Sequence, residues 1–396
     1  MDTTQCKVKT FAAIDQLKSR AVQALSELHA NPELGGQEHK SSEILCSWLE
    51  EAGYQVQRGL AGLPTAFCAQ IGQGIPGVAL IAEYDALPQL GHACGHDWSG
   101  VCSALAAVAL AKTMPGASIE GRVLVVGTPD EEGYGGKIPM IAAGVFSHID
   151  AAMMVHAFDE WCVKCESLAL QELGFEFQGK PAHAAAAPWE GINALDAVMV
   201  TFAGINCLRQ HIQDGSRIHG IVVEGGYATN VIPERAAARV CVRARSSQYM
   251  DTLLEKVVNC AKAGALATGC SLQVAQVGAR YESLRSNPTL EGLFTKNLAQ
   301  ASNGKVSVDT GPGPVIGSTD IGNLSQVVPT IQPLAGVAPA GTKPHTPEFA
   351  SATTTPSAIG ALLVCAKALS ATVIDLLADS GLRKRAWLDF KGQSAP

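Results

Sequence analysis

The stretch that decides the fold runs from residue 77 to residue 112 and reads GVALIAEYDALPQLGHACGHDWSGVCSALAAVALAK. It begins with an apolar run (77–82), passes through a loop that contains acidic, histidine and cysteine residues, and ends in an alanine-rich segment of helical length (99–112). A buried strand followed by a loop and a helix is the repeating unit of an α/β layer. The stretch therefore predicts an α/β fold, with polar side chains at the end of a strand.

The same alternation continues on both sides of this stretch. Apolar runs bounded by turn residues recur at 122–127 and 151–155, with a second alanine-containing helical segment at 136–144 between them. Towards the N-terminus, residues 11–30 and 38–52 carry apolar side chains at helical spacing. This order of strands and helices predicts an α/β class with a mixed, largely parallel sheet and flanking helices.

The pattern changes after residue 166. Residues 168–177 alternate like a half-buried strand, 191–212 and 250–267 have helical spacing, and 218–224, 235–245 and 271–277 are typical of strands. The order β-α-β-β-α-β is the ferredoxin-like arrangement. We therefore expect an inserted ferredoxin-like α+β domain at residues 167–285, which interrupts a larger domain made of residues 1–166 and 286–396.

The composition excludes several classes of protein. Hydrophobic residues make up 47% of the chain and charged residues 16%, against a usual share of about 25%, which excludes a disordered chain. The net charge of -7 without a basic run makes nucleic acid a poor partner. We find no run near the ~18 consecutive apolar residues of a membrane span, and no secretory signal pattern. The expected location is the cytoplasm, with no membrane partner.

The loop after residue 82 holds the densest group of possible ligands. Cys94 and His96 lie two residues apart beside glycines, so a thiolate and an imidazole can point at one place. Zn²⁺ and similar ions accept both ligand types. Two other interpretations stay open from these residues alone: a turn that merely contains a cysteine and a histidine, and a Cys94 nucleophile with His96 as its base.

Two adjacent carboxylates follow the apolar run 122–127. Glu131 and Glu132 repel each other at a strand end unless a cation compensates their charges. Because neighbouring residues of an extended chain point to opposite sides, one carboxylate could bind a metal ion while the other faces a water molecule. Metal-assisted hydrolysis needs this division of roles. The alternative is an acidic, solvated turn.

Two further histidines complete a possible ligand set. His156 ends the run 151–155, and His345 stands between two prolines that stiffen its backbone. Each could instead be a structural or loop histidine. Together the candidates are Cys94, His96, Glu132, His156 and His345. Five ligands exceed the needs of one tetrahedral zinc, so a shared ligand, such as the thiolate, would allow two ions.

At this point the sequence resembles a known family, that of the co-catalytic metallopeptidases and amidohydrolases, which includes aminoacylases, glutamate carboxypeptidase and auxin-conjugate hydrolases. It is most similar to the branch that holds aminobenzoyl-glutamate hydrolase and β-alanyl-lysine dipeptidase. The matching stretches follow the family order and cover about residues 15–370: 83–88 (EYDALP), 91–96 (GHACGH), 131–133 (EEG), 179–183 (GKPAH), 230–233 (NVIP), 317–320 (GSTD) and 345–349 (HTPEF). One departure is Asp97, where this branch tends to carry Asn.

The resemblance implies roles for these residues. The five candidate ligands would hold one or two divalent ions, Zn²⁺ first and Mn²⁺ second. Glu131 would be the general acid and base, and His183 would stabilise the oxyanion. Asp85 would orient a metal ligand without binding the ion itself. Asn230 and Arg243 would hold the carboxylate of the substrate. The inserted domain would be a lid that also forms a homodimer.

The sequence thus predicts a metal-dependent amidohydrolase or dipeptidase that cleaves a small dipeptide or N-acyl amino acid with a free carboxylate. The rival enzyme is a cysteine hydrolase that uses Cys94. The alternative without enzymatic activity is a family member that has lost catalysis and that binds a small ligand or serves as an assembly subunit. A dinucleotide-binding oxidoreductase does not fit, because no G-x-G-x-x-G opens a helix after a strand.

Overall fold

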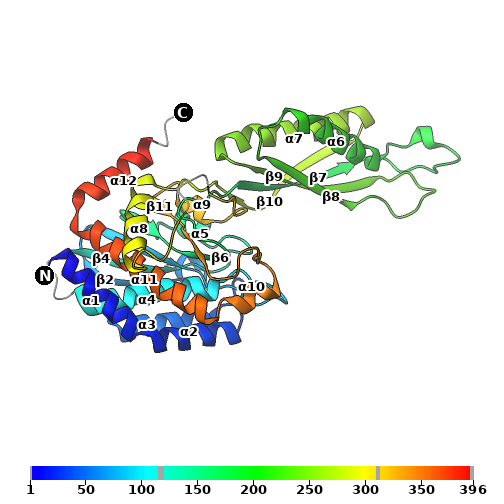
Figure 1. The fold of residues 1–396 in the computed structure, drawn as a ribbon. Helices are drawn as coiled ribbons and strands as arrows, with labels where there is room; N and C mark the ends of the chain where they lie inside the picture. Colours follow the sequence, from blue (N-terminus) through cyan, green and yellow to red (C-terminus); the bar gives the residue numbers. More distant parts are fainter. Residues whose placement is uncertain (1, 115–119, 309–312, 393–396) are drawn as a thin grey trace. The chain divides into compact units, whose positions relative to one another are not determined.

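The computed structural model describes residues 2–114, 120–308 and 313–392, and the chain divides into two compact units. The larger unit consists of Met1–Glu166 and Leu284–Pro396, and the smaller unit is Ser167–Ser283. Each unit has its own hydrophobic core. Figure 1 shows the elements of both units.

The described part of the larger unit is built on a six-stranded mixed sheet with the order β1-β2-β4-β3-β5-β11. The pairs β4–β3, β3–β5 and β5–β11 are parallel, and β1–β2 and β2–β4 are antiparallel. A separate parallel pair joins β6 and β12. The strands are β1 (Gln55–Arg58), β2 (Phe67–Gln73), β3 (Gly77–Ala82), β4 (Gly121–Gly127), β5 (Ala151–Met153), β6 (His156–Phe158), β11 (Thr330–Ile331) and β12 (Leu334–Gly336).

Helices cover both faces of this sheet (Figure 1). Because successive side chains of a strand point to opposite faces, Val78 and Leu80 of β3 join the larger core cluster, and Ala79 and Ile81 join the other. The first face packs against α1 (Thr3–Gln16), α2 (Lys18–Ala30), α3 (His39–Glu51), α4 (His96–Thr113), α8 (Pro288–Ala301) and α11 (Pro356–Ala378). The second face packs against α5 (Lys137–Ala142) and α9 (Ile321–Leu324). The unit also contains α10 (Pro347–Ala352) and α12 (Ser380–Gly392).

Helix α11 corrects the expectation that no apolar segment approaches the length of a membrane span. Its 23 residues include an 18-residue window of mean hydropathy 1.9, so length and composition alone would let it cross a membrane. However, 72% of that window is buried inside the structure, where the helix packs against α1, α4 and α8. A core helix has the same composition, so this one helix is weak evidence for a membrane span.

The smaller unit is an antiparallel four-stranded sheet with two helices. Its elements follow the order β7 (Ala169–Gln178), α6 (Ala194–Leu208), β8 (Arg217–Glu224), β9 (Arg235–Ala244), α7 (Ser247–Thr268) and β10 (Ser271–Tyr281). The sheet order is β10-β7-β9-β8, so β8 is an edge strand. Apolar side chains of β7 and β9 pack against α6 and α7 to form the core of this unit.

Candidate metal centre

The loop between β3 and α4 places the first two candidate ligands. Glu83 and Asp85 follow the last residue of β3, and His96 is the first residue of α4. Between Cys94 and His96, Gly95 has φ +80°, and a Cβ atom there would lie 2.5 Å from the Cβ of Ala157. Only glycine tolerates both this conformation and this close approach, so Gly95 is what allows the loop to present Cys94 beside the start of the helix.

Asp85 orients two of the candidates at once. Its Oδ1 lies 2.8 Å from Nδ1 of His96, and its Oδ2 accepts the backbone N–H of Glu132 at 2.9 Å. Asp85 and His96 are both buried. The carboxylate therefore sets the ring orientation of His96 and leaves its Nε2 as the atom available to a metal ion.

The other candidates come from separate segments of the same unit. His156, at the start of β6, lies with Nδ1 2.7 Å from the carbonyl of Ala157, and its Nε2 is 3.6 Å from Sγ of Cys94. His345 has φ +64°, and its backbone N–H donates to the carbonyl of Ala93. Its Nε2 lies 3.1 Å from Oε1 of Glu132.

These side chains converge on one place. Within each of three groups, one donor atom from every residue lies within 4.8 Å of the others: Cys94 with His96 and His156, Cys94 with Glu132 and His345, and His96 with Glu131 and Glu132. Cys94, His96 and Glu132 each belong to two groups, a pattern that suits two neighbouring ions with a shared ligand. All five sequence-predicted ligands, with Glu131 and Asp85, thus lie in one site.

Orphaned polar atoms show that the site fits a cation. Among the described residues, His96 Nε2 and Glu83 Oε2 are buried and have no hydrogen-bond partner. Buried polar atoms without partners are costly, and a divalent ion would satisfy both. The mixed donor set of sulfur, imidazole nitrogen and carboxylate oxygen is the kind that Zn²⁺ and related ions bind.

The pKa shifts of the buried groups also favour a bound cation. Burial raises the pKa of the Cys94 thiol well above its usual range. Burial, followed by the negative charges of Glu83 and Asp320, raises the pKa of Glu131 well above that of an ordinary carboxyl. Burial lowers the pKa of His156, which favours the neutral, metal-binding form of the ring. A cation would stabilise the anionic forms of Cys94 and Glu131.

Behind the site lies a buried charge network that sequence analysis did not predict. Nζ of Lys137 lies 2.6 Å from Oε1 of Glu83 and 2.6 Å from Oδ1 of Asp320, and all three side chains are buried. The other carboxylate oxygen of Glu83 is 3.6 Å from His96 Nε2. Glu83 therefore links the network to the metal centre. Glu83 and Asp320 stand in stretches that carry the family resemblance, whereas no motif marks Lys137.

The remaining predicted residues lie in the smaller unit. His183 is exposed, forms a β-bridge with Val231, and accepts the backbone N–H groups of Ala185 and Ala186 at Nδ1. This bridge places His183 beside Asn230, whose carbonyl accepts the N–H of Ala184. Arg243 lies near the C-terminal end of β9. It is eight residues beyond Arg235, the first residue of the strand, which corresponds to about 26 Å along the strand. Within its own unit, the structure does not bring Arg243 next to Asn230.

Comparison with known protein families yields one clear match. The family model described as peptidase family M20/M25/M40 matches residues 79–374, which is more than half of the chain. This range contains all five candidate ligands, the whole smaller unit and part of the larger unit.

Two curated relatives are similar over nearly their whole length. The Xaa-Arg dipeptidase of Mus musculus is 34% identical over 404 residues, which cover 96% of this chain and 93% of that protein. A p-aminobenzoyl-glutamate hydrolase subunit of Escherichia coli K12 is 31% identical over 441 residues, which cover 93% and 92%. Among solved structures, a Bacillus subtilis protein described as a dinuclear metal binding peptidase from the M20 family superposes with a TM-score of 0.71 at 20% identity. That superposition covers 92% of this chain and 99% of the other, and it shows a shared fold.

Proposed function

This chain belongs to peptidase family M20/M25/M40, and from that premise we propose that the centre around Cys94 is its catalytic site. Its activity is metal-dependent hydrolysis of amide bonds in small substrates. The convergence of five donor side chains around buried, unpartnered polar atoms is the observation that carries the proposal. We assign Cys94, His96, Glu132, His156 and His345 as ligands of one or two divalent ions, with Zn²⁺ favoured by the thiolate and Mn²⁺ as the second choice.

The chain's own residues divide the chemistry as follows. When bound, the ions would polarise the scissile carbonyl and make an attacking water more acidic. Glu131 takes a proton from that water and returns it to the leaving amine, a role supported by the raised pKa of this carboxyl. His183 is assigned to the oxyanion, and Arg243 to the carboxylate of the substrate, for which a guanidinium is well suited. The role of Asn230 at the same carboxylate stays a sequence prediction, because within one smaller unit Asn230 lies beside His183 and away from Arg243.

We assign the substrate to dipeptides or N-acyl amino acids with a free carboxylate. Two similarities support this class: the mouse relative is named a dipeptidase for Xaa-Arg, and the bacterial relative is named for hydrolysis of a glutamate conjugate. Both names describe an amide whose amine side is an amino acid.

We assign the smaller unit as a ferredoxin-like lid that also forms a homodimer. Its β-α-β-β-α-β order supports the first part. Edge strand β8 supports the second, because it exposes Ile221, Val222 and Val223, and natural proteins rarely leave an apolar strand edge uncovered. The mass of the protein in solution, measured by light scattering after gel filtration, would be that of a monomer if the dimer is wrong. A cytoplasmic location stays a prediction.

The central test combines metal removal with one substitution. Chelation should abolish cleavage of a dipeptide with a C-terminal arginine, and added Zn²⁺ or Mn²⁺ should restore it. Glu131→Gln should lower turnover by a factor of about 10²–10⁴ with its metal content unchanged, whereas Glu51→Gln, at the exposed last residue of α3, should have no effect. A Glu131→Gln enzyme that keeps full metal content and normal turnover would overturn the assignment. The same dipeptide with an amidated C-terminus tests the need for a free carboxylate.

A further inference from the structure

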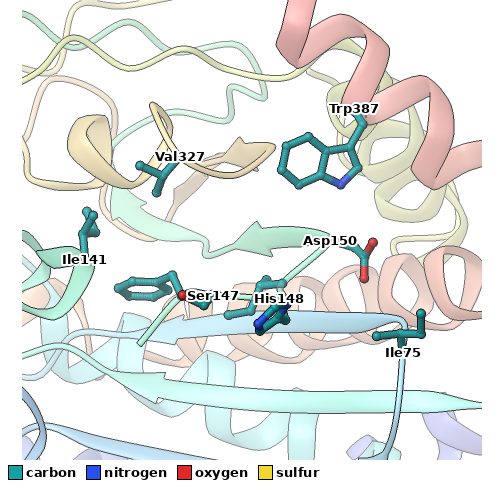
Figure 2. Close-up of a pocket in the computed structure, with 9 residues that line it drawn as sticks. Ile75, Ile141, Ser147, His148, Asp150, Val327 and Trp387 are labelled. Atoms are coloured by element: carbon teal, nitrogen blue, oxygen red, sulfur yellow. The ribbon is translucent and has the colours of Figure 1, made fainter. Parts of the chain in front are cut away.

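A cavity lies beside the C-terminal helix of the larger unit, away from the metal centre. It has a volume of about 520 Å³ and is mostly apolar, with Ile141, Phe146, Ile149, Val327 and Trp387 among its lining residues. Figure 2 shows the indole of Trp387 projecting from α12 into the space above His148 and Asp150. Volumes of this size are typical of sites for small organic molecules. We call this the apolar cavity.

A second cavity adjoins the first and is basic. Its volume is about 440 Å³, and Arg383, Lys384 and Lys391 of α12 line it. It shares two wall residues, Asp150 and Trp387, with the apolar cavity. We call this the basic cavity. The two cavities thus place an apolar surface next to three cationic side chains.

The walls of both cavities are held in place by buried or partly buried hydrogen bonds. Nδ2 of Asn287 donates to the carbonyl of Ala386 at 2.8 Å, and the Thr289 hydroxyl donates to Asp389 at 2.6 Å, which ties α12 to the start of α8 on either side of Trp387. Oδ2 of Asp150 accepts the backbone N–H of Gly77 at 2.9 Å. Because this oxygen is already bonded to the chain, the shared wall is preformed.

The two cavities lie at the opposite ends of the strands from the metal centre: Asp150 lies at the N-terminal end of β5, whereas Glu83 follows the C-terminal end of β3. Asp150 directly precedes β5, and His156 follows it six residues later, a separation of roughly 20 Å along an extended chain. A small molecule bound beside Asp150 therefore does not reach the metal ligands. The site is separate from the catalytic one, and its test does not depend on the proposed function.

We infer that the apolar and basic cavities together bind a small organic anion with a flat aromatic or branched apolar body. The body lies against Trp387 and the apolar wall, and the carboxylate faces Arg383, Lys384 and Lys391. Aromatic rings stack on indole, and an anion next to a cluster of cations gains charge-assisted hydrogen bonds. An uncharged molecule of the same shape gains only the first contribution, so the charge of the ligand is the property that the site selects.

The test compares cinnamate with cinnamyl alcohol, which has the same aromatic body without the charge. Isothermal titration of the metal-loaded, full-length protein should show saturable binding of cinnamate and at least about tenfold weaker binding of the alcohol. The double variant Lys384→Glu and Lys391→Glu should weaken cinnamate binding at least about tenfold and leave alcohol binding unchanged. Val327→Asp should weaken binding of both compounds.

Two substitutions outside the cavities serve as controls for the change of charge. Lys262→Glu and Lys305→Glu change two exposed lysines outside both cavities and should leave cinnamate binding unchanged. Val327, Lys384 and Lys391 are exposed, so their substitutions should not unfold the chain, and none of the variants should alter peptide cleavage. The inference is wrong if cinnamate does not saturate, if the alcohol binds as tightly, or if the Lys384/Lys391 double variant binds cinnamate normally.

Discussion

The imidazole of His96 lies with Nδ1 2.8 Å from Oδ1 of Asp85, and both side chains are buried. With Nδ1 engaged, Nε2 is the nitrogen left to face Glu83 and Glu131, whose nearest carboxylate oxygens are 3.6 Å and 3.9 Å away. Since Asp85 also accepts the N–H of Glu132, one carboxylate positions two residues of the metal centre.

Replacing Asp85 should therefore weaken metal binding without removing a ligand. We expect Asp85→Asn to lower metal affinity by about 10–100-fold, because the amide neither supports the His96 tautomer as well nor raises its basicity. Competition with a chromogenic chelator measures the change. Asp15→Asn, which alters an exposed ion pair with Lys367, is the control. Unchanged affinity in Asp85→Asn would mean that Asp85 does not orient the ligands.

The Lys137 network should matter for folding more than for binding. Lys137→Met would leave the carboxyls of Glu83 and Asp320 buried together without their counter-charge. Removal of one partner from a buried charge network costs about 3–5 kcal/mol of stability, so the urea midpoint should fall markedly. Lys367→Met, which removes the ion pair with exposed Asp15, should cost no more than about 1 kcal/mol. Similar losses in both variants would contradict this account.

The strands that the sequence predicts are the ones with continuous apolar runs. β3, β4 and β5 lie in the interior of the sheet and are buried along almost their full length, which gives an unbroken pattern. The edge strands β1 and β11 are not predicted, because β1 is polar and β11 has two residues. The partner of β11 is β5, which lies far away in the chain. The single helix expected at 11–30 is two helices that meet at Leu17.

The metal centre could be predicted because its residues follow strand ends in recognisable stretches. Cys94, His96, Glu132, His156 and His345 come from separate parts of the sequence, and the fold brings them together. Lys137 could not be predicted, since a lysine is almost never fully buried unless it is paired, and its partners lie 54 and 183 residues away.

The contact between His29 and Asp97 should make stability depend on pH. Nδ1 of His29 lies 2.8 Å from the buried carboxylate of Asp97, and this hydrogen bond raises the pKa of His29 above its ordinary value of 6.5. A raised pKa in the folded state adds stability that is complete below pH 6.5 and is lost as the pH rises through the folded value. The melting temperature of His29→Gln should thus fall below that of the unmodified protein by more at about pH 5.5 than at about pH 8.5.

A histidine outside this contact provides the control for that prediction. His211 is exposed in the smaller unit, and His211→Gln should show the same small difference at both pH values. An equal loss for His29→Gln at both pH values would mean that the charge of His29 does not contribute to stability.

The cysteine-nucleophile alternative makes the opposite prediction from the metal centre for the reactivity of Cys94. Burial raises the pKa of its thiol well above the usual range, so the metal-free protein should hold Cys94 as a thiol, which reacts slowly with iodoacetamide at neutral pH. Cys207 on α6 is exposed and should be alkylated first, which peptide mass mapping over a time course would show. A nucleophilic Cys94 would instead be modified at least as fast as Cys207, with loss of activity. Rapid alkylation of Cys94 in the metal-free protein would therefore support the cysteine hydrolase.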